Sequence, residues 1–191
     1  MSAALPSAVA NPALFLRRWL ANPLQMGSVV PSGPALCARV VAALRTAGAW
    51  PAEVLELGAG TGVIARALLD AGLPPGRLTV VEIVPEMAAH LRRVLPGARV
   101  IAADARALPL LGTAPPAEAV ICGIPLVLLG REAQRGFVAA MDALAPGRGF
   151  LHYSYCITSP LPARALGLAA RRVAWTPRNF PPASLWRYTP A

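Results

Sequence analysis

The stretch that most constrains the fold is residues 54–65, where an apolar run containing Glu56 leads into three alternating glycines. A helix-like pattern follows from Thr61 to about Asp70, so the stretch predicts a buried strand, a tight turn and a helix start. Glycine allows positive φ and lets a ligand approach without a Cβ in the way. Free N–H groups at a helix start can hold polar ligand atoms. The three glycines are Gly58, Gly60 and Gly62.

The spacing of these glycines excludes two common nucleotide sites. A dinucleotide motif needs glycine at position 63, where Val63 stands, and no Gly-Lys-Ser/Thr follows as in a phosphate loop. Residues 56–62, Glu-Leu-Gly-Ala-Gly-Thr-Gly, resemble the first motif of class I S-adenosylmethionine (SAM) methyltransferases. Glu56 suits the ammonium group of SAM better than a pyrophosphate. A turn without any ligand would leave this acid as an unexplained cost in an apolar strand.

Strand-like and helix-like segments alternate along the rest of the chain. This order predicts an α/β fold with a doubly wound, Rossmann-like sheet of seven strands, in which the last hairpin is antiparallel. We expect residues 34–191 to form the methyltransferase domain, and residues 1–33 to form a membrane-surface helix and a substrate-gating segment. The further strands are expected at 77–83, 98–103, 118–126 (with the exit from the strand), 150–157, 171–176 and 184–188, and helices at 34–47, 85–94 and 131–144.

Acids follow or end three successive predicted strands. Glu82 ends the second strand, where an acid can accept hydrogen bonds from a ribose diol. Asp104 follows the third strand and resembles the acid that contacts the adenine amino group in this superfamily. Single acids at strand ends are common, but the chain has only nine acids in all. The expected cofactor-binding residues are Glu56, Gly58, Gly60, Gly62, Glu82, Ile83, Asp104 and Ala105.

Composition narrows the class of partner. The net charge is +9 and all 18 basic residues are arginine, which favours anionic surfaces, either nucleic acid or lipid. No window has the run of about 18 apolar residues that a spanning helix needs, and we expect no secretory signal. The cysteines lie far apart without metal-ligand spacing, so we expect reduced thiols and no metal.

The N-terminal segment 11–23 predicts a short helix that begins at Asn11-Pro12. It places Phe15 and Trp19 at helical spacing beside adjacent arginines, one of them Arg18. A basic amphipathic helix with tryptophan is typical of a membrane-surface element, but a helix that covers a core edge fits equally well.

The exit from the fourth strand indicates the kind of acceptor. Adenine and amino-group methylases of DNA and rRNA carry an Asn or Asp and an aromatic ring there, for the flipped base. Here residues 122–126, Cys-Gly-Ile-Pro-Leu, have neither, which counts against a nucleobase substrate. On the fifth strand, alternation places His152 with Ser154 on one face and Tyr153 with Tyr155 on the other.

From Phe15 to Tyr188 the chain resembles the bacterial phospholipid N-methyltransferases, which convert phosphatidylethanolamine to phosphatidylcholine and are related to rRNA adenine dimethylases. The resemblance implies successive N-methylation with SAM, release of S-adenosylhomocysteine, and a cytoplasmic protein bound peripherally to an anionic inner membrane face. We expect no nucleic-acid partner and favour a monomer. The stretches that carry it are residues 15–23, 27–32, 56–62, 123–126 and 179–183, with Trp186 and Arg187.

The resemblance also assigns site residues. The Gly123 carbonyl would orient the lipid amine, with His152 or Tyr153 helping the proton leave. Arg178 or Arg187 would bind the lipid phosphate. The expected substrate-binding residues are Phe15, Arg18, Trp19, Pro125, Arg178, Asn179 and Arg187. Three alternatives stay open: an ornithine-lipid N-methyltransferase, an rRNA or DNA adenine N-methyltransferase, and a non-catalytic SAM- or lipid-binding protein.

Overall fold

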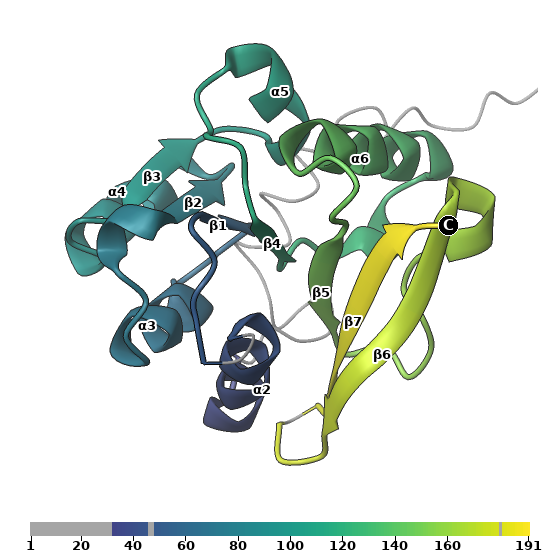
Figure 1. Cartoon of the computed structure of the whole chain (residues 1–191), viewed down its shortest axis with the longest axis horizontal. Helices are drawn as coiled ribbons and strands as arrows, with labels where there is room; N and C mark the ends of the chain where they lie inside the picture. The colour runs from purple at the N-terminus through teal and green to yellow at the C-terminus, as the bar shows by residue number, and fades with distance from the viewer. Residues whose placement is uncertain (1–31, 46–47, 180) are drawn as a thin grey trace, which may run out of the picture.

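The computed structural model describes residues 32–45, 48–179 and 181–191 (Figure 1). The expected N-terminal helix, with its candidates Phe15, Arg18 and Trp19, lies outside the described residues. The proposed division at residue 33 therefore stays a prediction.

A seven-stranded sheet of order β3-β2-β1-β4-β5-β7-β6 forms the centre of the described structure (Figure 1). Neighbours among β1 to β5 pair in parallel, and β7 is antiparallel to both β5 and β6. Consequently β6 runs in the direction of β5, and the carboxyl ends of all strands except β7 lie along one edge. The strands are β1 (Val54–Leu57), β2 (Leu78–Glu82), β3 (Arg99–Ala102), β4 (Ala119–Cys122), β5 (Phe150–Ser154), β6 (Leu168–Thr176) and β7 (Ala183–Pro190).

Helices cover both faces of the sheet (Figure 1). The expected fold class is confirmed, and α4 and α6 have the predicted bounds. The α-helices are α2 (Pro34–Leu44), α3 (Val63–Asp70), α4 (Pro85–Val94), α5 (Leu108–Leu111) and α6 (Arg131–Leu144). Short 3-10 turns are η1 (Pro75–Arg77), η2 (Ala105–Ala107), η3 (Leu126–Leu128) and η4 (Ala163–Leu166).

Several element bounds differ from those expected. Helix α2 ends at Leu44 instead of Ala47, and the four-residue helix α5 has no counterpart among the expected elements. Strand β5 ends at Ser154 instead of Ile157, since its pairing with β7 stops at the Ser154–Ser184 pair. In the final hairpin, β6 begins at Leu168 instead of Arg171 and ends at Thr176 as expected, and β7 covers Ala183–Pro190 instead of 184–188.

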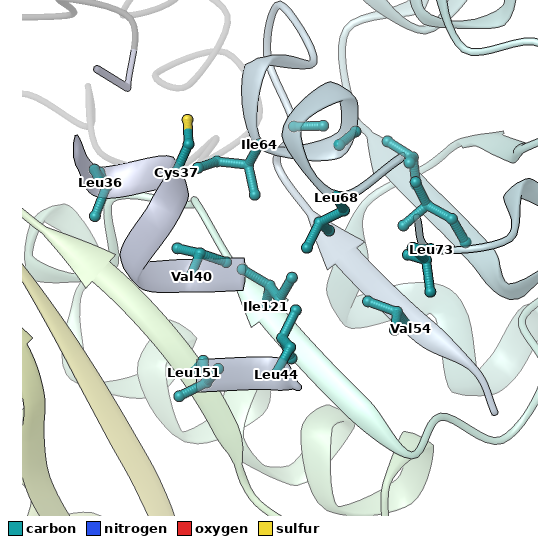
Figure 2. Packing of buried hydrophobic residues seen from close by; sticks show 14 of the residues in the cluster. Leu36, Cys37, Val40, Leu44, Val54, Ile64, Leu68, Leu73, Ile121 and Leu151 are labelled. Carbon is teal, nitrogen blue, oxygen red and sulfur yellow. The ribbon is translucent and has the colours of Figure 1, made fainter. Parts of the chain in front are cut away.

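The core has one layer of side chains on each face of the sheet. On one face, Leu36, Val40 and Leu44 of α2 pack over Ile121 and Leu151 of β4 and β5 (Figure 2). On the other face, α5 and α6 supply Leu108, Phe137 and Met141 among others. Each fully buried residue of this size contributes about 1.5–3 kcal/mol, so the paired layers hold the carboxyl edge of the sheet in a fixed geometry.

In the part of the chain that the structure describes, every helix is too short or too polar to cross a lipid bilayer.

Candidate active site

The glycine turn after β1 takes the left-handed backbone conformation at all three glycines, with φ of 70° at Gly58, 56° at Gly60 and 80° at Gly62. A Cβ on Gly58 would lie 2.8 Å from Ile124 Cγ1, and one on Gly62 would lie 2.7 Å from Leu91 Cδ2. Close packing therefore requires those two glycines. Nothing lies within 4 Å of a Cβ built on Gly60, so the turn leaves open space there that a ligand can enter.

Glu82, at the end of β2, holds this turn in place. Its side chain is buried, Oε2 accepts a hydrogen bond from Gly60 N at 3.0 Å, and Oε1 accepts one from Val84 N at 3.0 Å. Ile83 lies between these two groups and is half-buried. The acid expected at the ribose thus reaches the glycine turn directly.

Glu56 has a different environment. Its side chain is 0% exposed, and neither carboxyl oxygen has a hydrogen-bond partner. Burial first, and the nearby charge of Glu82 second, raise the pKa of Glu56 from an ordinary value of 4.5 to about 8. An ionised carboxylate in this position needs a cation or a donor, and an orphaned acid beside an open glycine turn fits the ammonium of a SAM molecule.

Asp104, which follows β3, is paired within the chain. Arg106 donates to it through Nε at 3.1 Å, Nη2 at 2.5 Å and the backbone N at 2.9 Å. Burial alone raises the pKa of Asp104, but the hydrogen bonds and charge of Arg106 outweigh burial and leave the pKa below its ordinary value. The carboxylate stays ionised next to buried Ala105, and its remaining lone pairs can accept from a ligand. No sequence pattern indicated that Arg106 contacts Asp104.

The segment after β4 lies against the glycine turn. Gly123 N donates to Leu57 O at 2.8 Å, and Pro125 is half-buried at the start of η3. Tyr153 reaches the same place from β5: a Cβ built on Gly123 would lie 2.1 Å from Tyr153 Oη. The structure therefore brings Gly123 and Tyr153 together beside the turn.

His152 points to the opposite face of β5, as the alternation predicted. Its Nδ1 lies 2.9 Å from Cys122 O, and because a carbonyl only accepts, the ring N–H donates. Burial is the main reason why the pKa of His152 falls to about 4. A neutral, enclosed ring committed to a backbone carbonyl is a weak base, which favours Tyr153 over His152 at the acceptor side.

The candidate substrate residues are not all gathered at this site. Asn179 is buried, and its amide is used within the chain: Oδ1 accepts from Gly33 N at 2.7 Å and Nδ2 donates to Pro181 O at 2.9 Å. Arg187 Nη2 donates to Ala43 O at 3.4 Å in the last turn of α2, away from the glycine turn. Arg178 is exposed in the turn between β6 and β7, at the carboxyl edge.

Ser32 is an additional residue that the structure brings to the acceptor side. Its hydroxyl lies within hydrogen-bonding reach of the phenols of Tyr153 and Tyr155. The Gly-x-x-x-Pro-Ser pattern at 27–32 was the available signal, because it marked a segment next to the cofactor domain. Over the described ranges, no group of three or more His, Cys, Asp or Glu side chains is placed to hold a metal ion.

Comparisons with known proteins agree with this geometry. A family model described as "Methyltransferase domain" matches residues 54–147, the span from β1 to the end of α6. None of the curated protein sequences compared with the chain matches it significantly.

Solved structures with the same fold include several methyltransferases. The 1,6-didemethyltoxoflavin-N1-methyltransferase of Burkholderia thailandensis, with bound 1,6-didemethyltoxoflavin and S-adenosylhomocysteine, has a TM-score of 0.70 at 21% identity, covering 100% of this chain and 94% of that chain. The N-methyltransferase NodS of Bradyrhizobium japonicum, in complex with S-adenosylhomocysteine, has a TM-score of 0.61 at 17% identity, covering 93% and 97%. CalS10 of Micromonospora echinaspora, a SAM-bound amino pentose methyltransferase, has a TM-score of 0.52 at 28% identity, covering 80% and 58%.

The domain match, the shared fold and the open glycine turn beside an unpartnered acid lead to one conclusion. Residues 54–147 match a methyltransferase domain, and the described part of the chain has the class I fold in which such domains use SAM.

Proposed function

We propose that this enzyme methylates the amino group of phosphatidylethanolamine at a membrane surface, successively giving the monomethyl and dimethyl lipids and phosphatidylcholine. The proposal requires an amine acceptor, a lipid surface and a site at which the two meet. The structure offers support for each requirement.

The observation that carries the lipid assignment is the position of the exposed apolar side chains. The six large apolar residues that are exposed in the described part lie near the end of β6 or on the segments that follow β3, β4 and β5. The glycine turn and the Gly123–Tyr153 contact occupy the same edge. Exposed apolar side chains on the segments that follow the strands, on a protein of net charge +9, suit an anionic lipid surface. These residues are Leu110, Leu111, Val127, Leu128, Ile157 and Trp175.

Amine chemistry has support from the acceptor side and from the fold. Residues 122–126 offer no base-stacking ring, so a flipped nucleobase has no aromatic partner on this segment. NodS is an N-methyltransferase, and the toxoflavin enzyme methylates at N1, so the fold accommodates nitrogen acceptors.

In this proposal different residues of the chain bind the cofactor and align the acceptor. Bound SAM supplies an electrophilic methyl group on a sulfonium. Glu56 would pair with the cofactor's ammonium, and Gly60 would leave room for its methionine part. Glu82 would accept hydrogen bonds from the ribose, and Asp104 would accept from the adenine amino group. The segment at Gly123 and Pro125 would align the neutral acceptor amine, and alignment supplies much of the rate enhancement. The amine nitrogen would form a bond to the methyl carbon as the bond from this carbon to sulfur breaks, S-adenosylhomocysteine would leave with the electron pair, and the proton of the methylated nitrogen would pass to solvent.

The experiment is an assay with labelled SAM and vesicles of anionic lipid with phosphatidylethanolamine, followed by identification of the labelled lipids. Label in mono-, di- and trimethylated headgroups supports the proposal and counts the methyl groups. Absence of lipid label, with SAM bound normally, contradicts it. Ornithine lipid and structured RNA are the next substrates to test. Label in RNA would favour a nucleic-acid methyltransferase, a class of enzyme that the net charge of +9 also suits.

A variant pair tests the lipid edge itself. Val127→Asn with Leu128→Asn should lower vesicle binding and lipid turnover severalfold while SAM binding stays unchanged. Ala165→Asn is the matched control, because Ala165 is exposed in η4, which precedes β6 at the opposite edge. Equal vesicle binding by both variants would remove the support that the apolar edge gives.

A further inference from the structure

The glycine at position 123 is explained by a side chain, not by its backbone. Gly123 does not have a positive φ, so residues with a side chain can adopt its backbone conformation. A Cβ at this position, however, would lie 2.1 Å from Tyr153 Oη and 2.7 Å from Tyr153 Cζ. The phenol of Tyr153 therefore occupies the space in which a side chain at position 123 would begin.

This space lies at the junction of the two halves of the site. The same Cβ would be 2.8 Å from Gly58 O in the glycine turn, and Gly123 N is bonded to Leu57 O at the end of β1. The Tyr153 phenol thus reaches from β5, across the exit of β4, to the turn where we place the cofactor. A group at this junction is next to the point where a methyl group passes from cofactor to acceptor.

Enzymes that methylate exocyclic amines of bases use a side-chain acceptor from the segment after β4, and this chain has none there. We propose that the Tyr153 phenol oxygen takes over that role by accepting a hydrogen bond from the acceptor amine, and that Gly123 exists to admit it. The inference rests on the amine chemistry of the proposed function, but not on the identity of the lipid.

The surroundings of Tyr153 suit a neutral acceptor. Burial first, and the charge of Glu56 second, raise the pKa of Tyr153 well above its ordinary value, so the phenol keeps its proton at neutral pH. A hydrogen bond with the Ser32 side chain acts in the opposite direction and lowers the pKa of Tyr153 by less than burial raises it. A phenol oxygen has two lone pairs, so one remains for the amine. This hydrogen bond does not use the lone pair of the amine nitrogen, which stays free to attack the methyl carbon.

The test compares two cofactor analogues and needs no lipid. S-adenosylhomocysteine lacks the methyl group. Sinefungin has a carbon in place of the sulfonium sulfur, and this carbon carries an amine where SAM carries the methyl group. Isothermal titration gives the ratio of their Kd values for the wild type and three variants: Tyr153→Phe, Gly123→Ala, and Tyr188→Phe. Tyr188 is a matched buried phenol whose hydroxyl lies 2.8 Å from Ser159 Oγ, outside the site.

We expect Tyr153→Phe to weaken sinefungin about 5- to 10-fold relative to S-adenosylhomocysteine, the size of one lost hydrogen bond. Gly123→Ala should do the same by displacing the phenol, and Tyr188→Phe should keep the wild-type ratio. Thermal unfolding checks that each variant is folded. An unchanged ratio in Tyr153→Phe, or an equal loss of both ligands, would overturn the inference. A negative lipid assay would instead contradict the lipid assignment, and the predicted change in the ratio of Kd values would still be expected.

Discussion

The unpartnered carboxyl of Glu56 provides the sharpest test of the cofactor site. This side chain is 0% exposed and both its oxygens lack partners. Burial, and then the charge of Glu82, raise the pKa of Glu56 to about 8. Replacement by glutamine keeps the shape and removes the titration, so Glu56→Gln isolates the free energy of ionisation.

The sign follows from proton linkage. In the unfolded chain this carboxyl titrates near 4.5, whereas in the folded protein it titrates near 8. Between these values the folded state binds one more proton than the unfolded state, so the free energy of unfolding falls as the pH rises. At about 1.4 kcal/mol per pH unit, the loss across this window is of the order of 5 kcal/mol.

Urea unfolding of ligand-free protein, measured from pH 5 to pH 8.5, is the assay. The wild type should lose stability relative to Glu56→Gln as the pH rises, by several kcal/mol in total, and the difference should level off above about pH 8. Groups that do not interact with Glu56 titrate alike in both proteins and cancel in the difference. Parallel curves for the two proteins would refute the reasoning that Glu56 is buried and unpaired.

The affinity for SAM should rise with pH, whereas the free energy of unfolding falls. If the ammonium of SAM pairs with ionised Glu56, the affinity of the wild type should rise roughly tenfold between pH 6.5 and 8. Glu56→Gln should bind SAM more weakly and without this pH dependence. An affinity that is independent of pH in the wild type would place the ammonium elsewhere.

Three further predictions concern the frame of the site. The His152 ring should titrate near pH 4 in an NMR titration, and a resonance assigned to His152 that titrates near 6.5 would show that the ring is not enclosed. Gly149→Ala should destabilise the fold by more than about 3 kcal/mol, because a Cβ would lie 1.9 Å from Tyr188 O and φ is 70°; thermal unfolding measures the loss, and a near-normal melting temperature would contradict it. Asn179→Ala should cost about 1–3 kcal/mol in urea unfolding by leaving Gly33 N without its acceptor, and a loss below about 0.5 kcal/mol would argue that this contact holds nothing in place.

The regular parts of the fold could be predicted because each follows from a local pattern. Helices α4 and α6 have proline or charged starts and clear apolar periodicity, and both were placed at their observed bounds. The end of β5 could not be predicted, since Tyr153 to Ile157 continues to look like a strand and only the pairing with β7 ends it at Ser154. The contact between Tyr153 and Gly123 was also hidden, because it depends on how two neighbouring strands are aligned.

The acids show where a sequence pattern stops being informative. Glu56 and Glu82 both follow apolar residues near the ends of adjacent strands, and the pattern assigned both to the cofactor. In the structure one carboxyl oxygen of Glu82 accepts a hydrogen bond from Gly60 N and the other accepts one from Val84 N, so its first role is to fix the turn. Glu56 makes no such bond and gains a partner only when a cation or donor arrives. Two acids of one type therefore differ in the structure: Glu82 fixes the turn, and unpartnered Glu56 is the acid that we propose for the ammonium of SAM, where binding would depend on its charge.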